Sequence, residues 1–228
     1  MCGRFTLISP GEVLAEFFEL VDTPTVSPRY NIAPTQAVGV VRRDRDRDIR
    51  RFDLMHWGLI PSWAKDPTIG NRMINARSET AATKPSFRSA VKYRRCLLPT
   101  DGFYEWKAIA GQKRKQPYYI RMADDRPFAF AGLWEHWEGP DGAAIDSCTI
   151  LTTEPNEMMA NIHNRMPVIL DPKDFAQWLD PSVQAADAIC PLLRSFPPEG
   201  MKAIPVNTTV NRPSNDTAAC IDPLDVDS

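Results

Sequence analysis

The sequence has no apolar run long enough to form a membrane-spanning helix. None of its 228 residues lies in a stretch that approaches the ~18 consecutive apolar residues of such a span. The first five residues, Met-Cys-Gly-Arg-Phe, also lack the basic and apolar regions of a secretory signal peptide. We therefore expect a cytosolic protein with no membrane partner.

Cysteine and histidine are scarce and scattered along the chain. The five cysteines are odd in number and widely spaced, no CxxC motif occurs, and there are three histidines. Disulfide frameworks and zinc sites need paired or closely spaced ligands. The sequence thus predicts neither of them, and we expect no cofactor. Packing or incidental roles are expected for Cys96, Cys148, Cys190 and Cys220.

A strong net charge is also missing. The formal charge of −2 gives no indication of a nucleic-acid partner. Residues 42–115 nevertheless hold 18 Lys+Arg against 8 Asp+Glu. Such a segment forms either one basic face for a polyanion or a set of charges that scatter over the folded surface. The sequence alone leaves both possibilities open.

Short segments with strand-like patterns dominate the chain. A hydrophobic content of 43% and a charged content of 25% are ordinary for a globular protein of this length. Few segments read as helices, chiefly 10–18 and 86–93, with a short one after Pro155. We predict one α+β domain over residues 1–228, with a mainly antiparallel sheet and a poorly ordered tail from about residue 213. The predicted strands are 38–41, 52–57, 95–99, 102–107, 117–121, 128–134, 148–153 and 166–170.

Two local patterns predict details of this fold. Ser9, Pro10 and Glu12 have the spacing of a capping box with a first-turn proline, and the apolar stripe that follows them is typical of a core-facing helix. Residues 42–51 alternate Arg and Asp, which indicates a solvated hairpin tip. The long irregular segment 58–74 is of a kind that is usually functional.

Cys2 has chemistry that no internal cysteine offers. Cys2 is a small residue directly after the initiator methionine, and such a residue permits removal of Met1. The removal would leave an N-terminal 1,2-aminothiol. The amine and the thiol have ordinary pKa values of roughly 7.7–8.0 and about 8.5, so both are reactive near neutral pH. The amine condenses with an aldehyde to an imine, and the thiol then closes a thiazolidine ring intramolecularly. Taken by itself, however, Cys2 is better explained as a small buried cysteine.

Three further segments supply acid–base and binding groups. Asn75 and Arg77 lie two residues apart, on one side of an extended chain. Glu105 lies among aromatic residues, an environment that raises a carboxyl pKa and suits general acid–base catalysis. His163 precedes a predicted strand and is a candidate proton shuttle. Each also has a structural alternative: a capping amide, a surface ion pair or a satisfied interior histidine.

The arrangement of six segments resembles the SOS response-associated peptidase (SRAP) family of abasic-site DNA–protein crosslinking proteins. The segments occur in the family's order between residue 2 and about residue 170. They are Cys2-Gly3-Arg4-Phe5, Tyr30-Asn31-Ile32-Ala33-Pro34, Trp57-Gly58-Leu59-Ile60-Pro61, Asn75-Ala76-Arg77-Ser78-Glu79-Thr80, Gly102-Phe103-Tyr104-Glu105-Trp106 and His163-Asn164-Arg165-Met166-Pro167.

The resemblance implies a twisted, barrel-like, mainly antiparallel core with flanking short helices and an active site at the processed N-terminus. It implies that Cys2 forms the crosslink and that Asn75, Glu105 and His163 are catalytic. Phosphate contacts are implied for Arg4 and Arg77, and stacking on bases for Trp63, with Trp57 as a second aromatic candidate. The implied partner is single-stranded DNA that contains abasic sites, bound by a monomer; on DNA the protein would be nucleoid-associated.

The implied reaction is stoichiometric trapping of the abasic aldehyde as a thiazolidine on Cys2. Met1 would be removed by a methionine aminopeptidase or by the protein itself, and the family name implies autoproteolytic peptidase activity beside a lyase-like one. Two other functions stay open at this stage. An N-terminal-cysteine amidase would turn over its substrate. A noncovalent reader of modified or single-stranded DNA would show steep salt dependence and no adduct.

Overall fold

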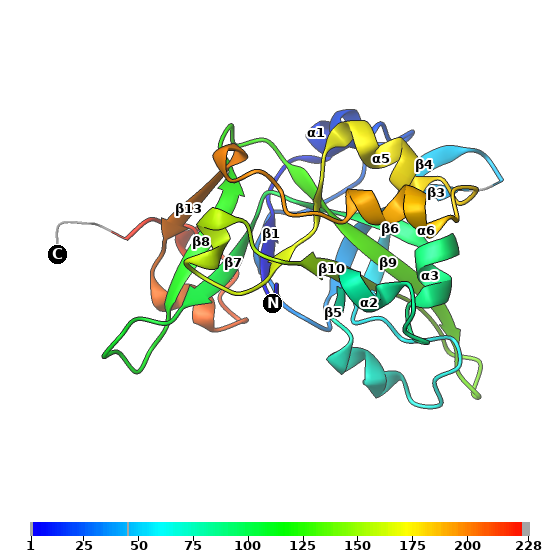
Figure 1. Ribbon diagram of the computed structural model, residues 1–228, viewed down its shortest axis with the longest axis horizontal. Helices are drawn as coiled ribbons and strands as arrows, with labels where there is room; N and C mark the ends of the chain where they lie inside the picture. Colours follow the sequence, from blue (N-terminus) through cyan, green and yellow to red (C-terminus); the bar gives the residue numbers. More distant parts are fainter. Residues whose placement is uncertain (1, 45, 225–228) are drawn as a thin grey trace.

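A closed β-barrel forms the centre of the computed structural model, which describes residues 2–44 and 46–224. Five strands make the ring, each paired with the next, and the β9–β10 pairing closes it (Figure 1). β10 is parallel to β4 and every other pairing in the ring is antiparallel, so the barrel is mixed. Around the ring the strands are β10 (Ala144–Thr153), β4 (Ile49–Trp57), β3 (Ala37–Asp44), β6 (Arg95–Thr100) and β9 (Phe128–Glu138).

A second, antiparallel sheet lies against the barrel. Its strand order is β13 (Met201–Pro205), β8 (Gln116–Met122), β7 (Gly102–Lys107), β1 (Phe5–Leu7) and β2 (Arg29–Ile32). The register pairs Phe5 with Phe103, and the backbone N–H of Tyr104 donates to Arg4 O at 3.0 Å. The same antiparallel register brings the first residues of the chain alongside Glu105.

Three short strands extend the barrel, two of them at β10 and one at β9. β5 (Asn75–Arg77) pairs with it in parallel and β11 (Met166–Pro167) pairs with it antiparallel. β12 (Ile169–Leu170) pairs with β9 instead. As a result, the predicted 166–170 strand is divided between two partners, and the segments that carry Asn75 and His163 meet along one strand.

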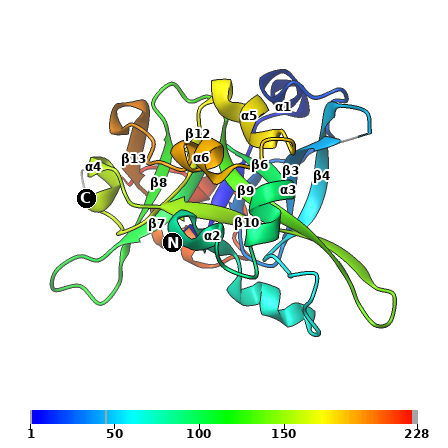
Figure 2. The same ribbon diagram turned by 45° about the vertical axis from the view of Figure 1, so that its right-hand side comes forward.

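The helices are short and lie outside the sheets (Figures 1 and 2). Within the described part of the chain, none is long and apolar enough to cross a membrane. The α-helices are α1 (Gly11–Phe18), α2 (Ser78–Ala81), α3 (Arg88–Tyr93), α4 (Glu157–Ala160), α5 (Phe175–Leu179) and α6 (Ala186–Ile189). Single 3-10 turns cover Pro67–Arg72, Pro172–Asp174, Cys190–Leu192, Pro198–Gly200, Thr208–Asn211 and Ala218–Cys220. The predicted α+β class and the barrel-like core are confirmed.

The predicted capping box of the first helix is wrong. α1 begins at Gly11 with no side-chain cap. The backbone N–H of Ser9 donates to Asp101 at 2.9 Å, and the Ser9 hydroxyl donates to the same carboxylate. The Ser9 hydroxyl, which a capping box requires, is therefore bonded to Asp101 and not to the helix. Through this contact Ser9 joins the chain before α1 to the turn between β6 and β7.

The charged 42–51 segment is mostly strand and less solvated than predicted. β3 continues to Asp44 and β4 resumes at Ile49, so the turn between them is short. Arg42 donates to Asp53 at 2.7 Å across the two strands. Alternating charges thus pair between neighbouring strands, where opposite charges stabilise a sheet.

The tail is tied to the second sheet as far as the structure describes it. The Asp216 carboxylate accepts from the backbone N–H of Asn31 at 2.9 Å, from that of Tyr30 at 2.5 Å, and from Arg29. Cys220 is fully buried. The sequence predicts little order from about residue 213, whereas residues 214–224 make these contacts; residues 225–228 lie outside the described part.

Replacing Asp216 with alanine should destabilise the fold by about 2 kcal/mol, because buried N–H groups of β2 would lose their acceptor. Thermal unfolding of the variant measures this loss. Asp222, which is exposed, provides the matched control: Asp222→Ala should leave the melting temperature unchanged. Equal melting temperatures for the two variants would show that the tail contributes nothing to stability.

Candidate active site

Cys2 lies where the barrel meets the second sheet. Its side chain is fully buried, and its carbonyl oxygen accepts a hydrogen bond from Asn75 Nδ2 at 2.8 Å. Burial raises the pKa of the Cys2 thiol, and the negative charge of Glu105 acts in the same direction. The thiol is therefore protonated at neutral pH and lies within electrostatic range of a carboxylate that can exchange a proton with it.

Glu105 is the acidic group of this site. It lies on β7 opposite the start of the chain, and its side chain is 3% exposed. Burial raises the pKa of the Glu105 carboxyl, while the interaction with His163 acts in the opposite direction. A raised pKa keeps the proton on a carboxyl to higher pH than in an ordinary glutamate, which suits a general acid.

His163 is held by the backbone that follows it. Its Nδ1 lies 3.0 Å from the backbone N–H of Arg165, which donates to it, and 3.1 Å from the Arg165 carbonyl oxygen. The neutral ring can accept the first bond and the protonated ring can donate the second. The orientation of the imidazole is thus preserved in both protonation states, which suits a proton shuttle.

An ion pair links the segments that carry Asn75 and His163. Arg165 donates to both carboxylate oxygens of Glu79, at 2.7 and 2.9 Å, and to the Thr152 carbonyl oxygen on β10 at 2.6 Å. This bidentate geometry holds both segments to the same strand. Sequence reasoning did not single out Glu79 or Arg165, although both lie inside the motifs that carry the family resemblance.

Of the two polar atoms of the Asn75 side-chain amide, only Nδ2 makes a hydrogen bond to a described residue. Nδ2 donates to Cys2, which fixes the amide plane. Oδ1 is buried and has no hydrogen-bond partner among the described residues. A buried acceptor left unsatisfied costs about 1–3 kcal/mol. A donor group such as an amine or a hydroxyl placed against Oδ1 would recover this cost.

The predicted DNA-contacting residues differ in accessibility. Arg77 is exposed and has no ion pair with a described residue, and Trp63 is 59% exposed. Arg4 is half-buried: its Nη1 donates to Asn31 Oδ1 at 2.8 Å and to Val210 O at 2.9 Å. Arg77 and Trp63 are thus free to contact a ligand, while Arg4 joins the second sheet to the turn Thr208–Asn211.

Trp57 cannot stack on a base, and this part of the sequence prediction is wrong. Its side chain is 0% exposed and its Nε1 donates to Ile74 O at 2.9 Å. The indole packs edge-on against Phe5, with ring centroids 5.1 Å apart. Trp57 ends β4 with its ring in the core, where its task is packing. The chain then turns at Gly58 (φ +140°) into the loop that presents Trp63.

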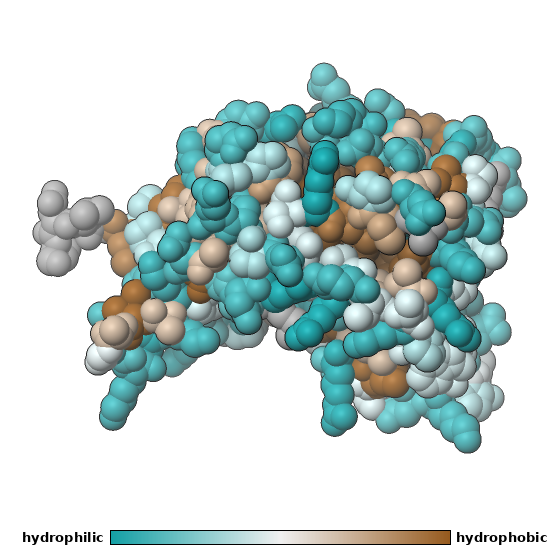
Figure 3. Space-filling model, in the orientation of Figure 1, coloured by the Kyte–Doolittle hydropathy of each residue, from teal (hydrophilic) through white to brown (hydrophobic). Residues whose placement is uncertain are grey.

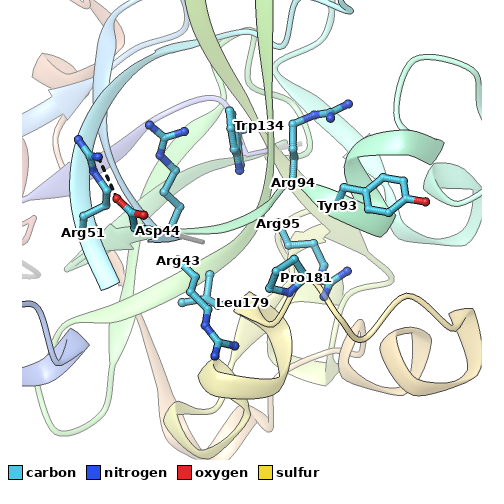
Figure 4. Close-up of a pocket in the computed structure, with 10 residues that line it drawn as sticks. Arg43, Asp44, Arg51, Tyr93, Arg94, Arg95, Trp134, Leu179 and Pro181 are labelled. Carbon is cyan, nitrogen blue, oxygen red and sulfur yellow. Dashed lines mark hydrogen bonds and ion pairs between the residues drawn. The ribbon is translucent and has the colours of Figure 1, made fainter. Parts of the chain in front are cut away.

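A separate group of arginines lies on the barrel, and we call it the arginine cluster (Figure 4). It borders an open cavity of about 320 Å³. Most of its charges are compensated: Arg94 pairs with Glu135 at 2.7 Å and Arg42 with Asp53 at 2.7 Å, whereas Arg95 donates only to backbone carbonyls. The members are Arg42, Arg43, Arg51, Arg94 and Arg95. Residues 42–115 therefore do not form one basic face, because many of their cations are neutralised locally.

The described residues hold no group of three or more His, Cys, Asp or Glu side chains arranged to bind a metal ion. The site itself brings together a thiol, a carboxyl, an imidazole and an amide. α2, which follows Asn75 and Arg77 in the chain, lies beside β10 in Figures 1 and 2. The four residues predicted to be catalytic are brought together: Cys2, Asn75, Glu105 and His163.

Comparison with known proteins finds relatives along almost the whole chain. Abasic site processing protein YoqW of Bacillus subtilis is 42% identical, covering 97% of this chain and 99% of that protein. Abasic site processing protein HMCES of Mus musculus is 31% identical, covering 99% of this chain and 77% of that protein. A crystal structure of a Bacteroides thetaiotaomicron protein matches with a TM-score of 0.86 at 26% identity, covering 97% of this chain and 99% of that one.

The family comparison agrees with these relatives. The model of the SOS response-associated peptidase (SRAP) family matches residues 1–213, a range that contains every element of the site described above. The chain therefore belongs to the SOS response-associated peptidase family.

Proposed function

We propose that this protein traps the aldehyde of an abasic site in single-stranded DNA as a thiazolidine on Cys2. The observation that carries the proposal is the convergence on Cys2 of a buried carboxyl, Glu105, and a buried amide with an open acceptor, Asn75. The names of the relatives, abasic site processing proteins, point to the same lesion.

The reaction balances as a condensation that releases one water. After removal of Met1, the Cys2 amine attacks C1′ of the ring-opened sugar, and the carbonyl oxygen takes a proton. Loss of that oxygen as water gives an imine. The sulfur then bonds to the same carbon, the C=N electrons pass to nitrogen, and the thiol proton follows them. The ring contains both nucleophiles of Cys2, and hydrolysis reverses the sequence.

Each neighbouring group has a role in these steps. Glu105, with its raised pKa, donates the proton for water loss and accepts protons from the amine or thiol. His163 assists opening of the cyclic sugar. Asn75 holds the Cys2 backbone through Nδ2 and offers Oδ1 to the new N–H or to a sugar hydroxyl. Arg77 and Trp63 are placed at the surface to contact a phosphate and a base.

Burial of the thiol favours this reaction over amide hydrolysis. An N-terminal-cysteine amidase needs a thiolate as its attacking group. Burial raises the pKa of the Cys2 thiol and so disfavours the thiolate. In thiazolidine formation the amine attacks first, and the thiol gives up its proton, which ends on the nitrogen, only as the ring closes.

Two oligonucleotides that differ in one oxygen test the proposal. One carries a true abasic site with its latent aldehyde, and the other a tetrahydrofuran analogue that has no aldehyde. We expect a heat-stable adduct on denaturing gels with the first only, limited to one DNA per protein. Binding to both without an adduct would support a noncovalent reader and overturn the proposal, as would repeated turnover of an amide substrate.

A further inference from the structure

The hairpin that joins β7 to β8 carries uncompensated positive charge. Residues 107–115 contain Lys107, Lys113, Arg114 and Lys115 and no acidic residue. The last three are exposed, and none of the four has an ion pair with a described residue. This hairpin projects from the body of the protein at the lower left of Figure 1, and Figure 3 shows strongly hydrophilic side chains extending from it. It differs in this respect from the arginine cluster.

Beside the hairpin lies an open pocket of about 400 Å³, which we call the anion pocket. Two arginines from distant parts of the sequence line it, together with hydroxyl and amide side chains and no carboxylate. Such a lining offers several hydrogen-bond donors to an anion and no repulsion. The lining residues are Arg114, Thr208, Thr209, Asn211, Arg212 and Asn215.

The wall of the anion pocket is held in place by buried polar groups. The Asn31 amide, which is fully buried, donates to the carbonyl oxygens of Arg212 at 3.0 Å and of Asn215 at 2.6 Å. Arg4 donates to the neighbouring Val210 carbonyl at 2.9 Å. The backbone that presents Arg212 is thus preorganised, and a ligand need not order it.

One side chain connects the anion pocket to the active site. Trp106 directly follows Glu105, and its Nε1 donates to Asn211 Oδ1 at 2.7 Å. The guanidinium of Arg4 lies 5.7 Å from the centre of the Trp106 ring. Trp106 therefore ties β7, the strand that carries Glu105, to the turn that lines the anion pocket.

We propose that the anion pocket, with the basic hairpin beside it, binds backbone phosphates of the DNA strand on one side of the abasic site. This proposal rests on the proposed function, and it adds a phosphate-binding subsite on one side of the lesion. Arg114 and Arg212 hold the phosphates, because they are the charged members of the pocket and have no ion pair with a described residue.

The test compares a double variant with a matched control. Arg114→Gln with Arg212→Gln removes two charges from the anion pocket. Arg88→Gln with Lys92→Gln removes two charges from exposed positions on α3, at the opposite end of the molecule in Figure 1. Fluorescence anisotropy measures the affinity of each protein for a single strand with the tetrahydrofuran analogue, which cannot crosslink, over a range of salt concentrations.

We expect the pocket variant to lose roughly tenfold in affinity near 0.1 M salt and its log–log salt slope to fall by about 1.4, since single strands contribute about 0.7 per phosphate contact. The control should change neither value beyond twofold. On oligonucleotides truncated 5′ or 3′ of the analogue, the loss should persist on one and vanish on the other. Equal losses on both, a pocket variant that matches the control, or a wild type that binds neither would overturn the proposal.

The same proteins separate this inference from the proposed function. If wild type binds the analogue through the anion pocket but forms no adduct with the aldehyde, the pocket is supported and the crosslinking function is contradicted. If wild type crosslinks fully while the pocket variant binds the analogue like wild type, crosslinking is supported and the pocket is contradicted.

Discussion

Replacing Cys2 with alanine should lower the yield of heat-stable DNA adduct by roughly a hundredfold or more. Alanine at position 2 still permits removal of Met1, so the variant keeps an N-terminal amine and can form an imine. It lacks the sulfur that closes the ring, and with it the high effective concentration of an intramolecular nucleophile. The imine hydrolyses during denaturation, and the adduct is lost.

Borohydride distinguishes this explanation from simple misfolding. The reductant converts an imine to a stable amine, so it should restore a large part of the adduct in Cys2→Ala and add little to wild type. Quantitative denaturing gels with and without borohydride give both values. An Ala variant that forms heat-stable adduct without reductant would mean that the thiol takes no part in the crosslink.

Replacing Glu105 with glutamine should slow crosslink formation by roughly 10²–10³-fold, the usual contribution of a positioned acid–base group. Glutamine has nearly the same shape but cannot exchange a proton with the amine, the departing water or the thiol. Single-turnover gel time courses measure the rate. The wild-type pH–rate profile should contain an ionisation above the ordinary glutamate pKa of about 4.3 that the variant lacks. A rate within threefold of wild type would remove Glu105 from the mechanism.

The same substitution, which slows crosslinking, should raise the stability of the fold at pH values above the glutamate pKa. Burial raises the folded-state pKa of Glu105 above its unfolded value. The native state therefore binds more protons in the interval between these pKa values, and wild type loses stability as the pH rises through that interval. Glutamine carries no charge to bury.

Thermal melts should thus show Glu105→Gln at least as stable as wild type at pH 8, with the advantage disappearing near pH 4. This pattern would show that the slow crosslinking comes from lost chemistry and not from a damaged fold. A variant that is less stable than wild type at pH 8 would instead indicate a structural role for the carboxylate.

The sequence was informative where local pattern and chemistry coincide. The strand β7 has the predicted bounds because 102–107 carries a continuous strand signal between a turn and a basic loop. The grouping of Asn75, Glu105 and His163 near Cys2 was predictable only through the family resemblance, since they come from separate strands and one loop. No periodicity relates residues so far apart in the chain.

Other features depend on tertiary contacts that a sequence does not display. Trp57 and Trp63 belong to the same stretch of sequence, yet one is in the core and the other is exposed, because the chain turns between them at Gly58. The Glu79–Arg165 pair spans 86 positions. Asp216 and Asn31 tie the last part of the chain to the second sheet, so a segment with the composition of a tail becomes part of the site's surroundings.

The most direct test of the account is the intact mass of the product from single-stranded DNA with one abasic site. The protein should first be shown to have lost Met1. We predict a species equal to the processed protein plus the DNA minus one water, stable to heat without a reductant and absent from Cys2→Ala. A processed wild-type protein that binds this DNA and yields no such species would contradict the account.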